Sequence, residues 1–246
     1  MRFRRRFIEG DGRDMTDLNG EAVLALWNGF EAGRTQEYDL WHTREHVPER
    51  LGVPGMLSAR RYERLEGALP QFLTLYDLET LDVLTSPAYR RLLDNPTEWS
   101  RSMRPSFRGF MRLCCQRTAS AGGGLGGWLM ATVVDERANV NADAARDWLM
   151  RLLDAPAVVA AHILRTDPAI PDVPFSAGGA ALDFPRAGAI LIESYSLEAL
   201  AASRPRIEAA FTDLGAGDAA RNATLYRLAY ALGHGSAARC RAVRRP

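Results

Sequence analysis

The sequence has few cysteines, three in 246 residues. Cys114 and Cys115 are adjacent, and Cys240 stands near the end of the chain. Neither the number nor the spacing matches a disulfide framework or a zinc knuckle. We therefore expect reduced thiols and a cytoplasmic protein.

A surplus of either charge is missing as well. The chain has 31 basic and 30 acidic side chains and a formal net charge of +1, so it has no overall field that would attract a polyanion. The basic ends, residues 1–19 and 234–246, are interpreted as a disordered or loosely attached arm and a solvated tail. A start of translation at Met1 and one at Met15 both fit this interpretation. We expect no nucleic-acid partner.

Long apolar runs are also absent. The longest, at residues 155–164, has ten residues and includes His162, which is too short to cross a bilayer. The hydrophobic fraction of 47% and the charged fraction of 25% are ordinary for a folded globular protein. We expect an ordered chain with no membrane partner.

A glycine-rich stretch divides the chain. Small residues and glycine dominate residues 117–127, and such a composition supports neither helix nor strand packing. The stretch is predicted to be a linker between a first domain, residues 20–116, and a second domain, residues 128–233.

Each half repeats one pattern of strands and helices, in the order βαββαβ. The first half predicts strand 22–30, helix 35–50, strands 56–65 and 71–78, helix 86–95 and strand 107–115. The second half predicts strand 127–135, helix 141–154, strands 158–167 and 188–196, helix 197–211 and strand 223–232. Thr35 and Ser86 are predicted N-caps, Pro87 suits the first helical position, and Pro205 is expected to interrupt its helix.

A βαββαβ unit is a ferredoxin-like α+β domain, with two helices on one face of an antiparallel sheet. The other face is apolar and uncovered, and two units can bury these faces against each other within one chain. At roughly 25 cal/mol per Å², burial of several hundred Å² is worth on the order of 10 kcal/mol. The predicted fold class is therefore α+β, with two tandem units forming an intramolecular barrel. The protein is expected to be a monomer with an internal pseudo-dimer, or a homodimer.

One segment of the first half carries a family resemblance. A predicted helix with Trp41, Glu45 and His46 leads through Pro54-Gly55 into a strand with Arg61-Tyr62. In this order the residues resemble the dimeric α+β barrel superfamily, in its EthD-like and uncharacterised branches. The resemblance spans residues 22–115. It implies the fold but not the activity, because members include monooxygenases, cyclases, decarboxylases, isomerases and haem-handling enzymes.

A departure from the superfamily concerns its cyclase-like and stress-responsive branches. Those branches resemble one another in an H-P-x-H segment before the second helix. This chain has Ser86, Pro87, Ala88 and Tyr89 there, so neither histidine is kept. Tyr89 is a poor base near neutral pH, because the ordinary pKa of tyrosine is about 10.

His42, Glu45 and His46 form an H-x-x-E-H pattern, which inverted zinc peptidases share. His42 and His46 lie four residues apart on one helical face, so both can reach one metal ion. Pro48 is expected to end or distort the helix, and strands follow where the peptidase needs a further ligand helix. A metal-dependent enzyme using these two histidines stays an alternative. A second alternative packs His46 at the helix end with His42 in solvent.

The preferred interpretation makes His46 an acid/base group in a pocket between helices and sheet. A position near a helix C-terminus is expected to raise its pKa and make it a proton donor. Arg61 and Tyr62 are the predicted orienting groups. The predicted ligand-binding residues are Trp41, Tyr76, Tyr89, Trp99 and Asn28. Asn28, next to Trp27, enters through a similarity to cofactor-independent monooxygenases, which use an Asn, a Trp and a Tyr.

These observations predict a protein that binds a small hydrophobic or aromatic molecule. If it is an enzyme, the expected chemistry is proton transfer, cyclisation or oxygenation of an aromatic or polyketide-like compound, and no cofactor is expected. A non-catalytic binding or scaffold protein is the competing class. Sequence alone does not decide between them.

Overall fold

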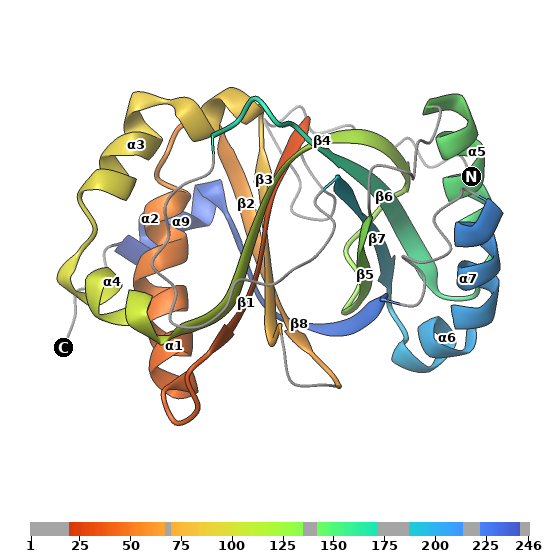
Figure 1. Cartoon of the computed structure of the whole chain (residues 1–246), viewed down its shortest axis with the longest axis horizontal. Helices are drawn as coiled ribbons and strands as arrows, with labels where there is room; N and C mark the ends of the chain where they lie inside the picture. The colour runs from red at the N-terminus through yellow and green to blue at the C-terminus, as the bar shows by residue number, and fades with distance from the viewer. Residues whose placement is uncertain (1–19, 67–69, 135–141, 172–186, 214–221, 242–246) are drawn as a thin grey trace, which may run out of the picture.

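The computed structural model describes residues 20–66, 70–134, 142–171, 187–213 and 222–241 (Figure 1). The predicted N-terminal arm, residues 1–19, lies outside the described residues. Residues 242–246, at the end of the predicted tail, lie outside them too.

The described elements follow the predicted βαββαβ order in both halves. The strands of the first half are β1 (Ala22–Phe30), β2 (Met56–Arg64), β3 (Phe72–Leu78) and β4 (Phe107–Gly122). Its helical segments are α1 (Thr35–Trp41), the π-helical turn η1 (His42–His46), α2 (Val47–Arg50), the 3-10 turn η2 (Leu81–Thr85), α3 (Pro87–Asp94), α4 (Glu98–Met103) and the 3-10 turn η3 (Arg104–Ser106).

The second half contains four strands as well. They are β5 (Trp128–Val134), β6 (Val158–Thr166), β7 (Gly188–Ser194) and β8 (Thr224–Gly233). Its helices are α5 (Ala142–Leu152), α6 (Leu197–Ala202), α7 (Arg204–Asp213) and α9 (His234–Arg241). The predicted interruption near Pro205 falls between α6 and α7. The sequence patterns did not predict α4 and α9.

The first predicted helix, residues 35–50, runs without a break but changes its hydrogen bonding in η1. There the N–H of Val47 donates to the carbonyl of His42, five residues back. Pro48 has no N–H to donate, so one α-helical hydrogen bond cannot form. The wider π-helical turn just before it accommodates this loss without ending the helix. The predicted distortion is therefore present, but the helix continues to Arg50. The prediction of Thr35 as N-cap is wrong, because Arg34 occupies that position and makes no side-chain cap.

The cap of α3 is as predicted. The hydroxyl of Ser86 accepts a hydrogen bond from the backbone N–H of Tyr89 at 3.2 Å, and Pro87 begins the helix. Such a cap satisfies one of the free N–H groups of the first turn. It stabilises the start of α3.

The eight strands form a closed barrel in the order β1-β3-β2-β8-β5-β7-β6-β4. Two seams join the half-sheets, one between β2 and β8, where Ala59 faces Leu232, and one between β4 and β6, where Ser120 faces His162. Both seams lie within one chain, so the barrel closes without a second subunit. The predicted fold class is confirmed.

The barrel interior is filled by apolar side chains from both halves. Strand residues alternate between the two faces of a sheet, and the inward-facing ones share one core. This core consists of Val23, Ala25, Trp27, Tyr62, Leu73, Leu75, Met111, Leu113, Cys115, Leu129, Ala131, Leu164, Ala189, Leu191 and Tyr226. Figure 1 shows the helices outside it, with α1 to α4 and α9 beside the first half and α5 to α7 beside the second.

A buried ionic network crosses the interior between the halves. The guanidinium of Arg60 lies 3.2 Å from a carboxylate oxygen of Glu193 and 3.1 Å from one of Asp77. The hydroxyl of Tyr62 donates to Glu193 at 3.0 Å, and the N–H of Gly126 donates to its other oxygen at 3.2 Å. Burial raises the pKa of Glu193 to about 7, against the opposing effect of Arg60.

Two predictions about irregular segments are wrong. The first part of the predicted linker, residues 117–122, belongs to β4, because β6 supplies backbone partners as far as Gly122. The predicted tail forms α9 over residues 234–241, where Ala237 is buried against the first half. His234 begins this helix. The division into two domains stays a prediction.

None of the helices in the described residues is long and apolar enough to cross a membrane.

Candidate functional site

A cavity of about 460 Å³ lies between the sheet of the first half and its helices. Leu24, Leu26 and Asn28 of β1 line it, together with Thr74 and Tyr76 of β3. These are alternate residues, so they face the helices while their neighbours face the barrel interior. Trp27 is one of those neighbours and belongs to the interior core. The paired use of Trp27 and Asn28 suggested by the monooxygenase similarity therefore does not occur in this cavity.

Helices α1 to α4 form the opposite wall. Trp41, His42, His46 and Tyr89 line it from this side. The aromatic side chains pack closely, with the rings of Trp41 and His46 at 4.4 Å between centroids. Of the predicted ligand-binding residues, Asn28, Trp41, Tyr76 and Tyr89 line the cavity.

Trp99 is the exception among them, because it packs beside the cluster of Phe30, Tyr38 and Phe107 and is not part of the lining.

The two histidines of η1 lie side by side. Their ring centroids are 5.6 Å apart, and Nε2 of His42 lies 3.5 Å from the hydroxyl of Thr74. The Nδ1 atom of each ring is buried and has no hydrogen-bond partner among the residues that the structure describes. Buried polar atoms without a partner are uncommon and costly. Here they mark places where a ligand can donate or accept a hydrogen bond.

Burial lowers the pKa of both histidines well below the ordinary value. The positive charge of Arg50 adds to this effect at both rings, and Arg104 adds to it at His46. The prediction of a raised pKa at His46 is therefore wrong, because the helix does not end there and burial outweighs its dipole. His42 is only 3% exposed, so its predicted position in solvent is wrong too. Both rings are neutral near pH 7 and can accept a proton.

Glu45, between the two histidines, fixes η1 to α4. Its carboxylate accepts hydrogen bonds from the hydroxyls of Thr97 and Ser100, the latter at 3.4 Å. Ser100 also accepts from the indole N–H of Trp41 at 3.2 Å. These contacts hold the aromatic wall and the histidines in one rigid arrangement.

The structure does not bring Arg61 and Tyr62 to the cavity. Tyr62 points into the barrel interior, where it contacts Glu193. Arg61 points to the helices but lies over the ring of Tyr38, 5.6 Å from its centroid, and 3.0 Å from Asp39 without the alignment of a hydrogen bond. Adjacent strand residues face opposite sides, so this pair could not share a ligand. The prediction that Arg61 and Tyr62 orient a ligand in this cavity is therefore wrong, because neither residue lines it.

The sequence patterns did not indicate the arginines of the lining, which are Arg50, Arg90, Arg104 and Arg112. Only Arg50 had a signal, because it lies four residues after His46 and so shares its helical face. The other three come from α3, η3 and β4, which only the fold brings together.

A metal site finds little support in the described residues. They contain no cluster of three or more His, Cys, Asp or Glu side chains that could hold an ion. His42 and His46 would supply only two ligands, whereas protein zinc sites use three or four.

No family model and no curated protein matches the sequence. Among solved structures, an anthrone oxidase-like protein has a TM-score of 0.60 at 13% identity, over 89% of this chain and 96% of its own. A protein from Lactobacillus acidophilus with a provisional monooxygenase assignment has a TM-score of 0.50 at 7% identity, over 87% of this chain and 97% of its own. Likeness at such identities shows a shared fold. The chain has the dimeric α+β barrel fold.

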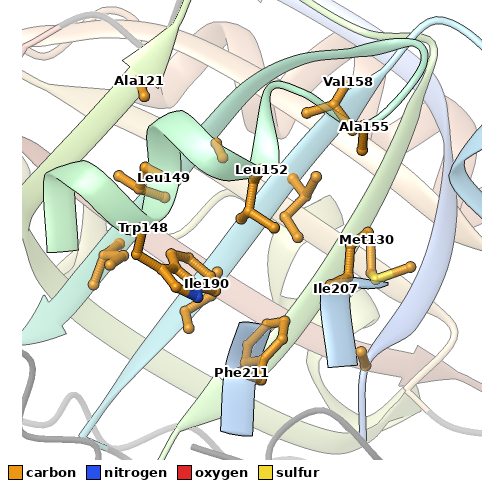
Figure 2. Close-up of a cluster of buried hydrophobic side chains, with 14 of the residues drawn as sticks. Ala121, Met130, Trp148, Leu149, Leu152, Ala155, Val158, Ile190, Ile207 and Phe211 are labelled. Atoms are coloured by element: carbon orange, nitrogen blue, oxygen red, sulfur yellow. The ribbon is translucent and has the colours of Figure 1, made fainter. Parts of the chain in front are cut away.

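The two halves of this α+β barrel differ in the space between helices and sheet. In the second half that space is packed with apolar side chains, as Figure 2 shows for Trp148, Leu152, Ile190 and Phe211. Trp148 is fully buried and donates its indole N–H to the carbonyl of Ala210 at 2.7 Å. The cavity with its polar groups belongs to the first half.

Proposed function

We propose that the cavity binds a small aromatic or polyketide-like molecule and that His46 removes a proton from it as a general base, without a cofactor. One observation carries this proposal. Two neutral imidazoles line a cavity of about 460 Å³, and each has a buried Nδ1 without a hydrogen-bond partner in the described part of the chain.

The cavity suits an aromatic ligand. Small-molecule pockets are typically about 300–1,000 Å³ and mostly apolar, with a few polar groups that fix orientation. Here Trp41, Tyr76 and Phe107 offer ring faces and edges, while Leu24 and Leu26 offer apolar surface. Offset and edge-to-face contacts with these rings would stabilise a planar molecule.

His46 is better placed than His42 to act as the base. Its side chain is only half-buried, whereas His42 is almost completely enclosed. Because the pKa of His46 is lowered, its ring stays unprotonated throughout the neutral range. In the proposed step one proton moves from an acidic C–H or phenolic O–H of the ligand to the imidazole, which leaves an enolate or phenolate.

Such an anion can cyclise, or can react with dissolved dioxygen as the oxidant. The similarity in fold to an anthrone oxidase-like protein supports anthrone, an enolisable tricyclic ketone, as the first compound to try. The proposal does not depend on which of the two later reactions follows.

Hydrogen–deuterium exchange tests the proton-transfer step directly. Wild-type protein is expected to accelerate exchange of the methylene protons of anthrone in D₂O under argon, as measured by NMR. The His46→Gln variant should lose about 100-fold or more of that acceleration, within the range typical of a general base. His234→Gln, at an exposed position on α9, is the matched control and should keep the wild-type rate.

Two results would contradict the proposal. Acceleration that persists in the His46→Gln variant would remove the assigned base. Tight binding of anthrone with no acceleration in the wild-type protein would instead identify a non-catalytic binding protein.

A further inference from the structure

We infer that the natural ligand of this cavity carries a carboxylate, which Arg50 and Arg104 bind beside His46. The inference rests on the proposed function, because it names the chemical class of the same ligand.

The cavity lining is rich in positive charge. Its four arginines are Arg50, Arg90, Arg104 and Arg112, and its only acidic residues among those described are Glu49 and Asp94. The arginines come from four separate elements, α2, α3, η3 and β4. The whole chain has nearly equal numbers of basic and acidic side chains, so this local surplus is a property of the cavity.

Arg50 is the most informative of the four. It is half-buried, and its guanidinium makes no hydrogen bond or ion pair with the part of the chain that the structure describes. Its charge is close enough to lower the pKa of His42 and of His46. A partly desolvated guanidinium without a counter-charge is costly, so an anionic ligand would gain from meeting it.

Arg104 approaches His46 as well, and its charge also lowers the pKa of that ring. Its guanidinium donates to the carbonyl of Leu93 at 3.5 Å, which is a long hydrogen bond. Its five N–H donors leave most of its capacity for a ligand. Arg50 and Arg104 therefore present two cations from different elements to one place in the cavity.

Tyr76 adds a third donor without an acceptor. Its hydroxyl is buried and has no hydrogen-bond partner among the described residues; burial raises its pKa, which keeps the proton on the hydroxyl, and nearby Arg50 only partly opposes this effect. A group that joins Arg50, Arg104 and Tyr76 must accept several hydrogen bonds and donate none. A carboxylate does so, with two oxygens and about four lone-pair sites.

A pair of probes that differ in one group tests this inference. The probes are 9-anthracenecarboxylate and 9-anthracenemethanol, which share ring system and approximate size but differ in charge. We expect the carboxylate to bind wild-type protein about tenfold or more tightly than the alcohol, as measured by probe fluorescence at pH 7.5 and low ionic strength. The Arg50→Gln variant should lose this preference while it keeps its affinity for the alcohol.

Two further variants complete the design. Arg104→Gln should also reduce the preference for the carboxylate over the alcohol. This variant provides the test if Arg50→Gln fails to fold. Arg91→Gln is the matched control, because Arg91 is exposed on α3 and lies outside the lining. Its preference for the carboxylate should equal that of the wild-type protein.

The failure of this inference is distinguishable from failure of the proposed function. Equal affinity for the two probes, or an undiminished preference in both cavity variants, would overturn the carboxylate and leave the aromatic site intact. Absence of binding by both probes would overturn the aromatic site, and the carboxylate with it.

Discussion

The Glu193→Gln substitution should remove a pH-dependent contribution to the free energy of unfolding that one buried carboxyl makes in the wild-type protein. Glu193 lies inside the barrel, in contact with Arg60 and Tyr62. Its pKa is raised from the ordinary value of 4.5 to about 7, with burial as the largest cause. Between these two pH values the folded protein therefore holds a proton that the unfolded chain releases.

The direction and the size of the effect follow from this difference. Stability contributed by the protonated carboxyl is fully present below pH 4.5, falls as pH rises, and is lost above about pH 7. At about 1.4 kcal/mol per pH unit, the loss across this window is about 3 kcal/mol. The Glu193→Gln variant has no proton to lose there and keeps a neutral side chain of similar shape. The free energy of unfolding of the variant, relative to that of the wild-type protein, should therefore be about 3 kcal/mol higher at pH 8 than at pH 4.5.

Urea unfolding followed by tryptophan fluorescence at several pH values measures this difference. The buried histidines titrate in both proteins, so their contribution largely cancels when the two curves are subtracted. A difference in the free energy of unfolding that stays constant from pH 4.5 to pH 8 would refute the argument, because Glu193 would then have the same pKa in the folded and unfolded chain.

Two other substitutions test close packing, one between the helices and sheet of the second half and one at the seam of β4 and β6. Trp148→Ala should lower the free energy of unfolding by about 3–5 kcal/mol, because it empties a fully buried site. Met150→Ala, at a 52% exposed position of the same helix, should stay within about 0.5 kcal/mol of wild type, and comparable losses in both would contradict this account. Gly122→Ala should cost more than about 1 kcal/mol, because φ is +77° and a Cβ would lie 2.2 Å from the carbonyl oxygen of Val159. At Gly127 a Cβ meets nothing within 4 Å, so equal losses for Ala at both glycines would show that the contact is not responsible.

Local patterns predicted the elements well where a single face of each was buried. The cap at Ser86 and the hairpin of β2 and β3 depend on residues close in the sequence, and both are present. The facing of side chains on β2 was harder to predict. Arg60, Arg61 and Tyr62 are all buried, because helices cover one side of that strand and the barrel core covers the other, so polarity does not alternate.

Features that depend on distant partners could not be predicted from local composition. Residues 117–122 look unsuited to a strand until β6, more than 35 residues later, supplies their hydrogen bonds. His46 was found from its motif, but the sign of its pKa shift is set by burial, which results from the packing of elements that are distant in the sequence. The candidate base was thus predictable, whereas its protonation state and the surrounding cations were not.

The unequal filling of the two halves has a consequence for stoichiometry. A barrel made from two identical subunits would carry two equivalent chambers related by symmetry, whereas in this chain one chamber is occupied by its own tryptophan and phenylalanine side chains. Titration should therefore saturate at one molecule per polypeptide along a simple hyperbola. Within the described residues, the packed half therefore serves as support for the barrel wall, and its interior positions are constrained by packing and not by a ligand.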